Sequence, residues 1–143
     1  MSDAYLLLET PKFSASFRKR VVAPPKYHVV DNGLRRVVSP QAAPDHERRI
    51  ENAVAVEFLR RGEAPCYAAE RDSWECDFVT RGTVWQVCWQ LDEENKTREI
   101  RGLLGAREQS RAKRMVILTR DQRQILRESG EVIEILPAWE WLG

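Results

Sequence analysis

The order of apolar and polar residues along this chain predicts strands interrupted by two amphipathic helices. Short apolar runs bounded by turn residues indicate strands, and those expected to form a sheet cover residues 66–69, 74–80, 83–91, 115–119 and 131–136. The first helix is predicted over 45–61, where Ile50, Val54 and Phe58 recur every four residues and would share a buried face. The second helix is predicted over 93–113. This alternation favours an α/β fold with a central mixed sheet flanked by helices.

The segments around these elements carry weaker signals. Residues 4–9 and 12–17 predict two short strands separated by Thr10-Pro11, and residues 27–30 predict another strand before the turn Asp31-Asn32-Gly33. We expect a loop over 39–44 and a helix or turn over 121–129. Asp45 suits the N-cap of the first helix, and Gly62 suits its C-terminal stop.

Length and composition fit one globular domain of a cytoplasmic protein. The chain has 143 residues, of which 43% are hydrophobic and 31% charged, which is ordinary for such a domain. No apolar run approaches the roughly 18 residues of a membrane span, and the start Met-Ser-Asp-Ala lacks the basic residues of a signal peptide. Three cysteines without CxxC spacing indicate reduced thiols, and two histidines argue against a histidine-based zinc or iron centre.

Charge is distributed unevenly along the chain. Residues 1–40 carry seven Lys or Arg residues against three acids, a net charge of +4, whereas the remainder has a net charge of −3. A basic segment of this kind can contact nucleic acid, and the contacts would then be Arg18, Lys19, Arg20, Arg35 and Arg36. The alternative is an ordinary solvated surface. The same two interpretations apply to the arginines between Arg98 and Arg114.

Acidic and amide side chains are placed where two neighbouring strands and a helix could bring them together. Strand alternation puts Glu75 and Asp77 on one face of their strand. It also puts Gln86 and Cys88 on one face of the next strand, with Trp85, Val87 and Trp89 on the opposite face as core residues. Glu51 lies at the edge of the buried face of the first helix.

These side chains include the oxygen ligands that Mg²⁺ prefers. Glu51, Asp77 and Gln86 therefore form a candidate site for Mg²⁺ or Mn²⁺, with Asp77 as the central ligand. The alternative to a metal ligand is that Glu51 is an ordinary acidic residue near a helix N-terminus, where the helix dipole stabilises its negative charge. Asp77 is harder to explain without a site, because burial of an unpaired carboxylate in an apolar strand is costly.

The order helix–β–β–β–helix–β, with acids on the helix and on the second strand, resembles the core of the PD-(D/E)XK, or restriction-endonuclease-like, fold. The similarity extends to sequence, because several segments resemble the C-terminal domain of a family of archaeal and bacterial AAA+ ATPases; they are 27–35, 50–62, 75–79, 86–88 and 137–142. The resemblance covers the chain from about Ala4 onward. It implies that residues 1–40 correspond to the end of a winged-helix region and that residues 41–143 form the nuclease-like domain.

The same resemblance implies partners, and the absence of a phosphate-binding motif argues against ATP as a ligand. The chain has no Gly-x-x-x-x-Gly-Lys-[Ser/Thr] motif, so it should not bind ATP by itself. The candidate partners are DNA, an ATPase module and a second copy of the chain. No membrane partner is expected.

Two functions follow, because the third part of the nuclease motif is altered. Active members of this fold carry Glu-X-Lys where this chain has Gln86-Val87-Cys88. The resemblance thus assigns the catalytic positions to Asp77, Gln86 and Cys88. Lys96, at a different place in the sequence, would supply the positive charge of the missing lysine. The alternative interpretation of Cys88 is a small core residue. The altered motif favours a degenerate module that binds nucleic acid or a partner, with weak or no catalysis. Retention of Glu51 and Asp77 favours a Mg²⁺-dependent DNA endonuclease.

Overall fold

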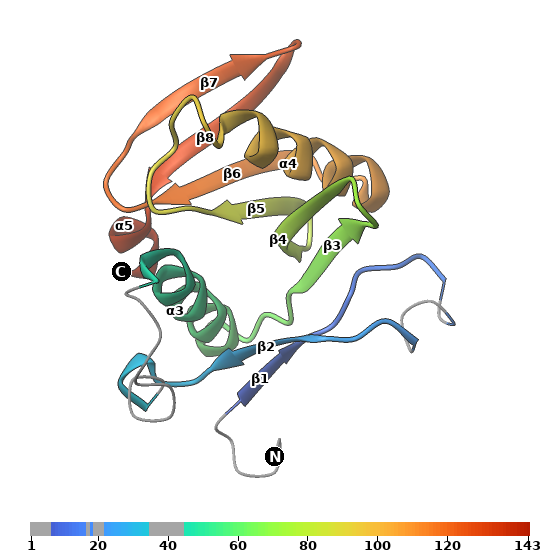
Figure 1. The fold of residues 1–143 in the computed structure, drawn as a ribbon, viewed down its shortest axis with the longest axis vertical. Helices are drawn as coiled ribbons and strands as arrows, with labels where there is room; N and C mark the ends of the chain where they lie inside the picture. The colour runs from blue at the N-terminus through green and yellow to red at the C-terminus, as the bar shows by residue number, and fades with distance from the viewer. Residues whose placement is uncertain (1–6, 17, 19–21, 35–44) are drawn as a thin grey trace.

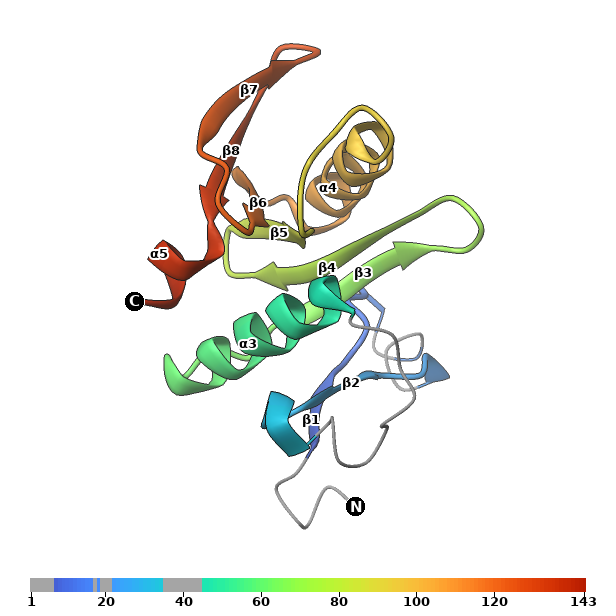
Figure 2. The ribbon, with the colours of Figure 1, turned by 60° about the vertical axis from the view of Figure 1, so that its left-hand side comes forward.

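A mixed six-stranded sheet forms the centre of the molecule, with helices on both of its faces (Figures 1 and 2). The computed structural model describes residues 7–16, 18, 22–34 and 45–143. A separate two-stranded sheet, built from β1 (Leu7–Thr10) and β2 (Lys26–Val29), lies beside the helix α3 and the strand β3. The α/β architecture predicted from the sequence is thus confirmed.

The central sheet has the strand order β3-β4-β5-β6-β8-β7. Its strands are β3 (Cys66–Glu70), β4 (Trp74–Thr80), β5 (Thr83–Val87), β6 (Arg114–Thr119), β7 (Gln124–Glu128) and β8 (Glu131–Pro137). Strands β3, β4 and β5 are antiparallel neighbours, β6 is parallel to both β5 and β8, and β7 is antiparallel to β8. The predicted strands 66–69, 74–80, 115–119 and 131–136 are confirmed, whereas the strand predicted over 83–91 ends at Val87.

Two other predictions of secondary structure were wrong. Residues 121–129 contain the strand β7 rather than a helix or turn, because Ser129 and Gly130 both adopt positive φ (51° and 80°) and thereby close a tight hairpin between β7 and β8. The strand predicted over 12–17 does not form in its described part, where Lys12 makes an isolated bridge to Tyr67. The loop predicted over 39–44 lies outside the residues that the structure describes.

Helix α3 (His46–Arg60) begins and ends where the sequence signals indicate, whereas α4 (Lys96–Ser110) is three residues shorter at each end than the helix predicted over 93–113. Helix α3 is capped by Asp45, whose carboxylate accepts a hydrogen bond from the Arg48 N–H at 3.1 Å, and it is followed by Gly62 at φ 71°. Helix α4 covers one face of the sheet, while α3 and the short α5 (Ala138–Leu142) cover the other. None of the helices in the described part of the chain is long and apolar enough to cross a bilayer.

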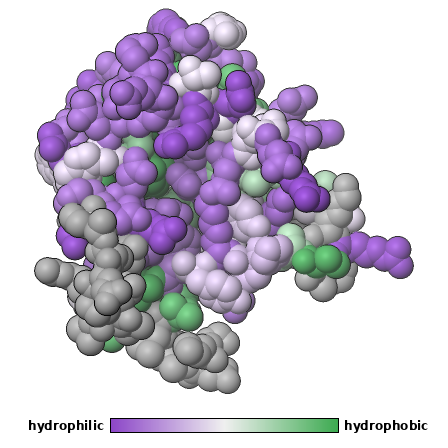
Figure 3. All heavy atoms as spheres, in the orientation of Figure 1, coloured by the Kyte–Doolittle hydropathy of each residue, from purple (hydrophilic) through white to green (hydrophobic). Residues whose placement is uncertain are grey.

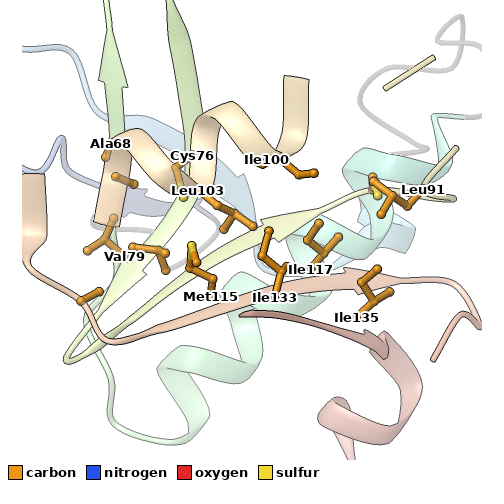
Figure 4. Packing of buried hydrophobic residues seen from close by; sticks show 14 residues of the cluster. Ala68, Cys76, Val79, Leu91, Ile100, Leu103, Met115, Ile117, Ile133 and Ile135 are labelled. Atoms are coloured by element: carbon orange, nitrogen blue, oxygen red, sulfur yellow. The ribbon is translucent and has the colours of Figure 1, made fainter. Parts of the chain in front are cut away.

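Apolar side chains fill both faces of the sheet. Under α4, Leu103 packs with residues of five strands (Figure 4), including Ala68, Cys76, Val84, Met115 and Ile133. Under α3, Phe58 packs with its ring centroid 5.6 Å from Trp85 and 4.9 Å from Trp141. The predicted core roles of Trp85 and Val87 are confirmed, since both are buried, whereas Trp89 is only half-buried and packs its ring against His46.

Helix α4 approaches the sheet closely because two of its residues are glycines. A Cβ atom on Gly102 would lie 2.1 Å from the Glu75 carbonyl oxygen and 2.8 Å from Gln86 Nε2. A Cβ atom on Gly105 would lie 2.2 Å from the ring of Trp74. This close packing brings Glu99, one turn before Gly102, against the polar residues of β4 and β5.

Candidate functional site

A polar cleft of about 900 Å³ opens where β2, α3, β4, β5 and the start of α4 meet. Acidic side chains outnumber basic ones along its walls; they are Asp45, Glu47, Glu51, Glu75, Asp77 and Glu99 against Lys26, Arg48 and Arg98. Hydrophilic residues also dominate the face of the molecule drawn in Figure 3. The cleft is therefore suited to a cation or to a cationic group rather than to a bare phosphate.

A bulge in β4 directs Asp77 into this cleft. Two steps along β3, from Cys66 to Ala68, correspond to three steps along β4, from Val79 to Cys76, so β4 contains an extra residue here. Such bulges bend a strand and change the direction of a side chain. In consequence Cys76 packs in the core under α4, while Asp77 faces the cleft.

Asp77 and Gln86 hold β4 and β5 together where the regular ladder ends. The paired residues of these strands stop at Phe78 and Trp85. Beyond them, the Asp77 N–H donates to Gln86 Oε1 at 2.8 Å, and the Val87 N–H donates to Asp77 Oδ2 at 2.9 Å. The structure thus places Asp77 and Gln86 next to each other, but these bonds join each side chain to the backbone of the neighbouring strand and do not join the two side chains as expected for shared metal ligands.

Both the oxygen and the nitrogen of the Gln86 amide form hydrogen bonds within the protein. Besides accepting from Asp77, it donates from Nε2 to the Glu75 carbonyl oxygen at 3.1 Å and to Glu99 Oε2 at 2.8 Å. Its side chain is buried, with 4% of the residue exposed. Glu99 is in turn paired with Arg98 at 2.7 Å. Gln86 therefore joins the two strands and α4, and it does not present its amide to a ligand.

Lys26 places its ammonium group among the carboxylates of the cleft. Its Nζ lies 2.5 Å from Glu75 Oε1, 3.5 Å from Asp77 Oδ1 and 3.8 Å from Glu51 Oε1. We call Glu51, Glu75 and Asp77 the acid cluster. Although burial alone would lower the pKa of Lys26, the neighbouring carboxylates, led by Asp77 and Glu51, raise it above its ordinary value. Sequence reasoning missed this residue, although it directly precedes the predicted strand 27–30.

The acid cluster carries more negative charge than one ammonium group balances. Burial, together with repulsion from Glu51, raises the pKa of Asp77 to about 7, although Lys26 and the Val87 N–H act in the opposite direction. Burial likewise raises the pKa of Glu51. The Glu51 side chain is 21% exposed and faces the cleft as predicted. Protons and cations are therefore alternative ways of stabilising this cluster.

His28 is a second cleft residue that sequence reasoning did not single out. It lies on the same face of β2 as Lys26, it is 3% exposed, and its ring centroid is 5.5 Å from that of Phe78. Burial and then the charge of Lys26 lower its pKa to about 4, against the effect of a hydrogen bond with Asn52. Its Nε2 is buried and, within the described structure, has no hydrogen-bond partner. Such an unsatisfied atom is rare in a folded protein.

The predicted metal ligands fit Mg²⁺ or Mn²⁺ in part. Asp77 and Glu51 supply hard oxygen atoms of the kind these ions bind, and both face the cleft. Gln86 does not fit, because its amide is used within the protein. Among the residues that the structure describes, no three His, Cys, Asp or Glu side chains are grouped closely enough to hold a metal ion. The ammonium group of Lys26 lies among the carboxylates instead.

Two of the predicted catalytic residues lie elsewhere. Cys88 is 0% exposed and belongs to the core under α4, where burial raises the pKa of its thiol to about 12. Its alternative interpretation as a core residue is the correct one, because its side chain points into the packed layer and not into the cleft. Lys96 lines a separate hollow with Trp74 and Ile100, so the structure does not bring it to the acid cluster.

Most of the predicted nucleic-acid contacts lie outside the residues that the structure describes. Arg18 is exposed, whereas no structural statement applies to Lys19, Arg20, Arg35 and Arg36. Several of the later arginines form ion pairs with acids of this chain, as Arg98 does with Glu99 and Arg114 with Glu134. The Arg114–Glu134 pair is the arrangement expected of a solvated protein surface, whereas Arg98 pairs with the buried Glu99 at the wall of the cleft.

Comparisons with known proteins find uncharacterised relatives. No protein-family model matches the chain, and no solved structure matches it. An uncharacterised protein of Methanocaldococcus jannaschii is 28% identical over 152 residues, which cover 98% of this chain and 34% of that protein. An uncharacterised protein of Haemophilus influenzae is 28% identical over 146 residues, covering 99% of this chain and 34% of that protein. The chain therefore spans about a third of the length of these curated relatives.

Proposed function

We propose that the chain is a degenerate PD-(D/E)XK nuclease-fold module, which binds nucleic acid or a partner protein and hydrolyses phosphodiester bonds weakly or not at all. The element order α3–β3–β4–β5–α4–β6 around a mixed sheet supports this assignment. So does the meeting of a helix acid, Glu51, with a strand acid, Asp77, in one cleft.

The main support for weak or absent hydrolysis is the hydrogen bonding of Gln86. Phosphodiester hydrolysis by a metal-dependent nuclease needs a cation that activates water and neutralises charge in the transition state. A neutral amide provides less charge than a carboxylate, and this amide is bonded to Asp77, Glu75 and Glu99. Since Cys88 is packed in the core, the third part of the motif supplies neither an acidic ligand nor a cation to the cleft.

The proposed protein partner is an ATPase module of the AAA+ type. The resemblance of the sequence to the C-terminal domains of such ATPases supports this part of the proposal. The length of the relatives is in agreement, because about two thirds of each lies outside the matched region. The sheet formed by β1 and β2 would then belong to the segment that joins the two parts.

A plasmid assay and a binding assay together test the proposal. We expect the chain to show no robust cleavage of supercoiled DNA with Mg²⁺, and at most weak nicking with Mn²⁺, while it retains binding to DNA or to an ATPase module. Asp77→Ala should leave this binding largely intact. Strong cleavage by the wild-type chain that is lost in Asp77→Ala would contradict the proposal, as would absence of binding to either partner.

A second candidate function is a Mg²⁺-dependent DNA endonuclease, and the position of Lys26 favours it. Its Nζ lies 3.5 Å from Asp77 Oδ1, where a positive charge could stabilise a scissile phosphate. If this function is correct, Lys26→Met should lower the rate of DNA cleavage by a factor of about 100 or more. Lys113→Met is a matched control, because Lys113 is exposed and lines a different hollow. Equal activity of both variants would exclude a catalytic Lys26.

A further inference from the structure

We propose that Lys26 is a tethered counter-cation, which occupies the acid cluster until a divalent cation displaces it. The proposal rests on the proposed function only in taking the cleft as the ligand site. It assigns to Lys26 neither the role of a metal ligand nor that of a catalytic residue. Its consequence is that the chain binds Mn²⁺ or Mg²⁺ more weakly than its carboxylates alone would allow.

The geometry places ammonium and metal in competition for the same oxygen atoms. Lys26 Nζ is within 4 Å of carboxylate oxygens from Glu51 and Asp77, which are the two predicted ligands that fit a metal ion. A divalent cation bound to both would lie close to a group of like charge, and the two would repel strongly in a partly buried cleft. The ammonium must therefore move before the metal binds.

The surroundings of Lys26 give it an outward path. Its closest partner is Glu75, whose side chain is 55% exposed, whereas the side chains of Glu51 and Asp77 are 21% and 16% exposed. The ammonium can thus remain paired with Glu75 at the rim and leave the two deeper carboxylates. The flexible four-carbon stem of lysine permits such a movement, and the ring of Tyr67, 5.4 Å from Nζ, offers a further favourable contact.

An independent feature of the same cleft indicates that a ligand completes it. His28 is buried beside Lys26 on β2, lines the cleft and has no partner for Nε2 within the described structure. Leaving a buried polar atom without a hydrogen-bond partner destabilises a folded protein. A bound cation with its coordinated water molecules would bring a hydrogen-bond donor to this wall of the cleft.

Titration with Mn²⁺ alone, followed by calorimetry, tests the competition. We compare the wild-type chain, Lys26→Met and the control Lys113→Met, with Asp77→Ala as the variant that should lose binding. Lys26→Met should bind Mn²⁺ at least about tenfold more tightly than wild type, because a like charge is removed from the site. Lys113→Met should match the wild type. Binding that is unchanged or weaker in a folded Lys26→Met overturns the proposal.

A second measurement uses the unmodified chain, in case Lys26→Met does not fold. Lysine acetylation, mapped by mass spectrometry, reports how accessible each ammonium group is. Saturating Mn²⁺ should increase the acetylation rate of Lys26 several-fold and leave that of Lys113 unchanged. A rate for Lys26 that stays constant or falls overturns the proposal, as does absence of Mn²⁺ binding in every variant. These outcomes are separate from the proposed function, which is judged by nucleic-acid and partner binding.

Discussion

Asp77 and Gln86 replace a missing stretch of β-ladder with side-chain hydrogen bonds. The Asp77 N–H donates to Gln86 Oε1 at 2.8 Å, and the carboxylate of Asp77 accepts the N–H of Val87, the residue after Gln86, at 2.9 Å. The two side chains therefore perform for β4 and β5 what the backbone performs between Phe78 and Trp85. A substitution at either position should change the stability of the sheet as well as the chemistry of the cleft.

Restoring an acid at position 86 is expected to destabilise the chain. Gln86→Glu places a second carboxylate against Glu99 Oε2, where a hydrogen bond of 2.8 Å now exists, and a lost bond of this kind costs about 1–3 kcal/mol. Gln86→Glu/Glu99→Gln should recover part of the loss, since the new amide at 99 can donate to the new carboxylate. Urea denaturation at pH 7 measures both. Additive effects of the two substitutions would contradict this coupling.

Asp77 should make the folded chain less stable as pH rises from about 4 to about 7. Its pKa is raised from 3.8 to about 7 in the folded chain, so the unfolded chain loses this proton first. Asp77→Asn removes that effect and keeps an acceptor for the Val87 N–H. We expect it to be more stable than wild type at pH 8 by at most about 4 kcal/mol, because a shift of about three pKa units at about 1.4 kcal/mol each sets the upper limit. Denaturation at pH 4 and pH 8 gives the comparison, and an unchanged pH slope would refute it.

His28 should act in the opposite direction over an overlapping pH range. Its pKa is lowered from 6.5 to about 4 in the folded chain, so the unfolded chain binds a proton first as pH falls between these values. The stability contributed by neutral His28 is therefore lost as the solution becomes more acidic. His28→Gln should reduce this acid-induced loss, whereas His46→Gln, at an exposed position, should not. Thermal melts between pH 4 and pH 7 distinguish the two variants.

Gly102 should tolerate alanine less well than Gly105 does. In an exposed helix, alanine is about 1 kcal/mol more favourable than glycine. At position 102, however, the new methyl group would meet the Glu75 carbonyl oxygen, which is backbone, whereas at position 105 it would meet the Trp74 side chain. We expect Gly102→Ala to lower the free energy of unfolding by several kcal/mol, and Gly105→Ala by less. The reverse order in chemical denaturation would show that α4 does not pack as closely as described.

The sequence predicts elements well where one local pattern decides them. The helix stripe of Val54 and Phe58, and the alternation around Trp85, correctly place α3 and β5 against each other. The strand β7 was missed because its identity depends on the hairpin turn at Ser129 and Gly130, which local hydrophobicity does not reveal. The strand over 83–91 was predicted too long, because apolar residues continue beyond Val87 after the regular pairing ends.

The candidate site was predicted only where its residues follow strand alternation. Asp77 and Gln86 are neighbours across β4 and β5, although each side chain bonds the backbone of the other strand, and Glu51 lines the same cleft from α3. Lys26 could not be predicted in the same way, because its contacts with residues 51–77 depend on how two separate sheets are arranged. Cys88 was assigned by its position in a motif, yet its side chain belongs to the α4 core. A motif gives the position along the chain, while packing decides the direction of the side chain.

The separation of the two sheets has a consequence for the order of folding. The buried core lies within residues 54–138, with Phe13 packed at its margin, whereas Lys26 and His28 reach the cleft from β2. The core of the six-stranded sheet does not include β2, so this sheet can form before β2 associates with it. Until then, Asp77 and Glu51 face water without a counter-charge. Loss of the β1–β2 sheet alone would therefore open the cleft while leaving the core of the six-stranded sheet intact.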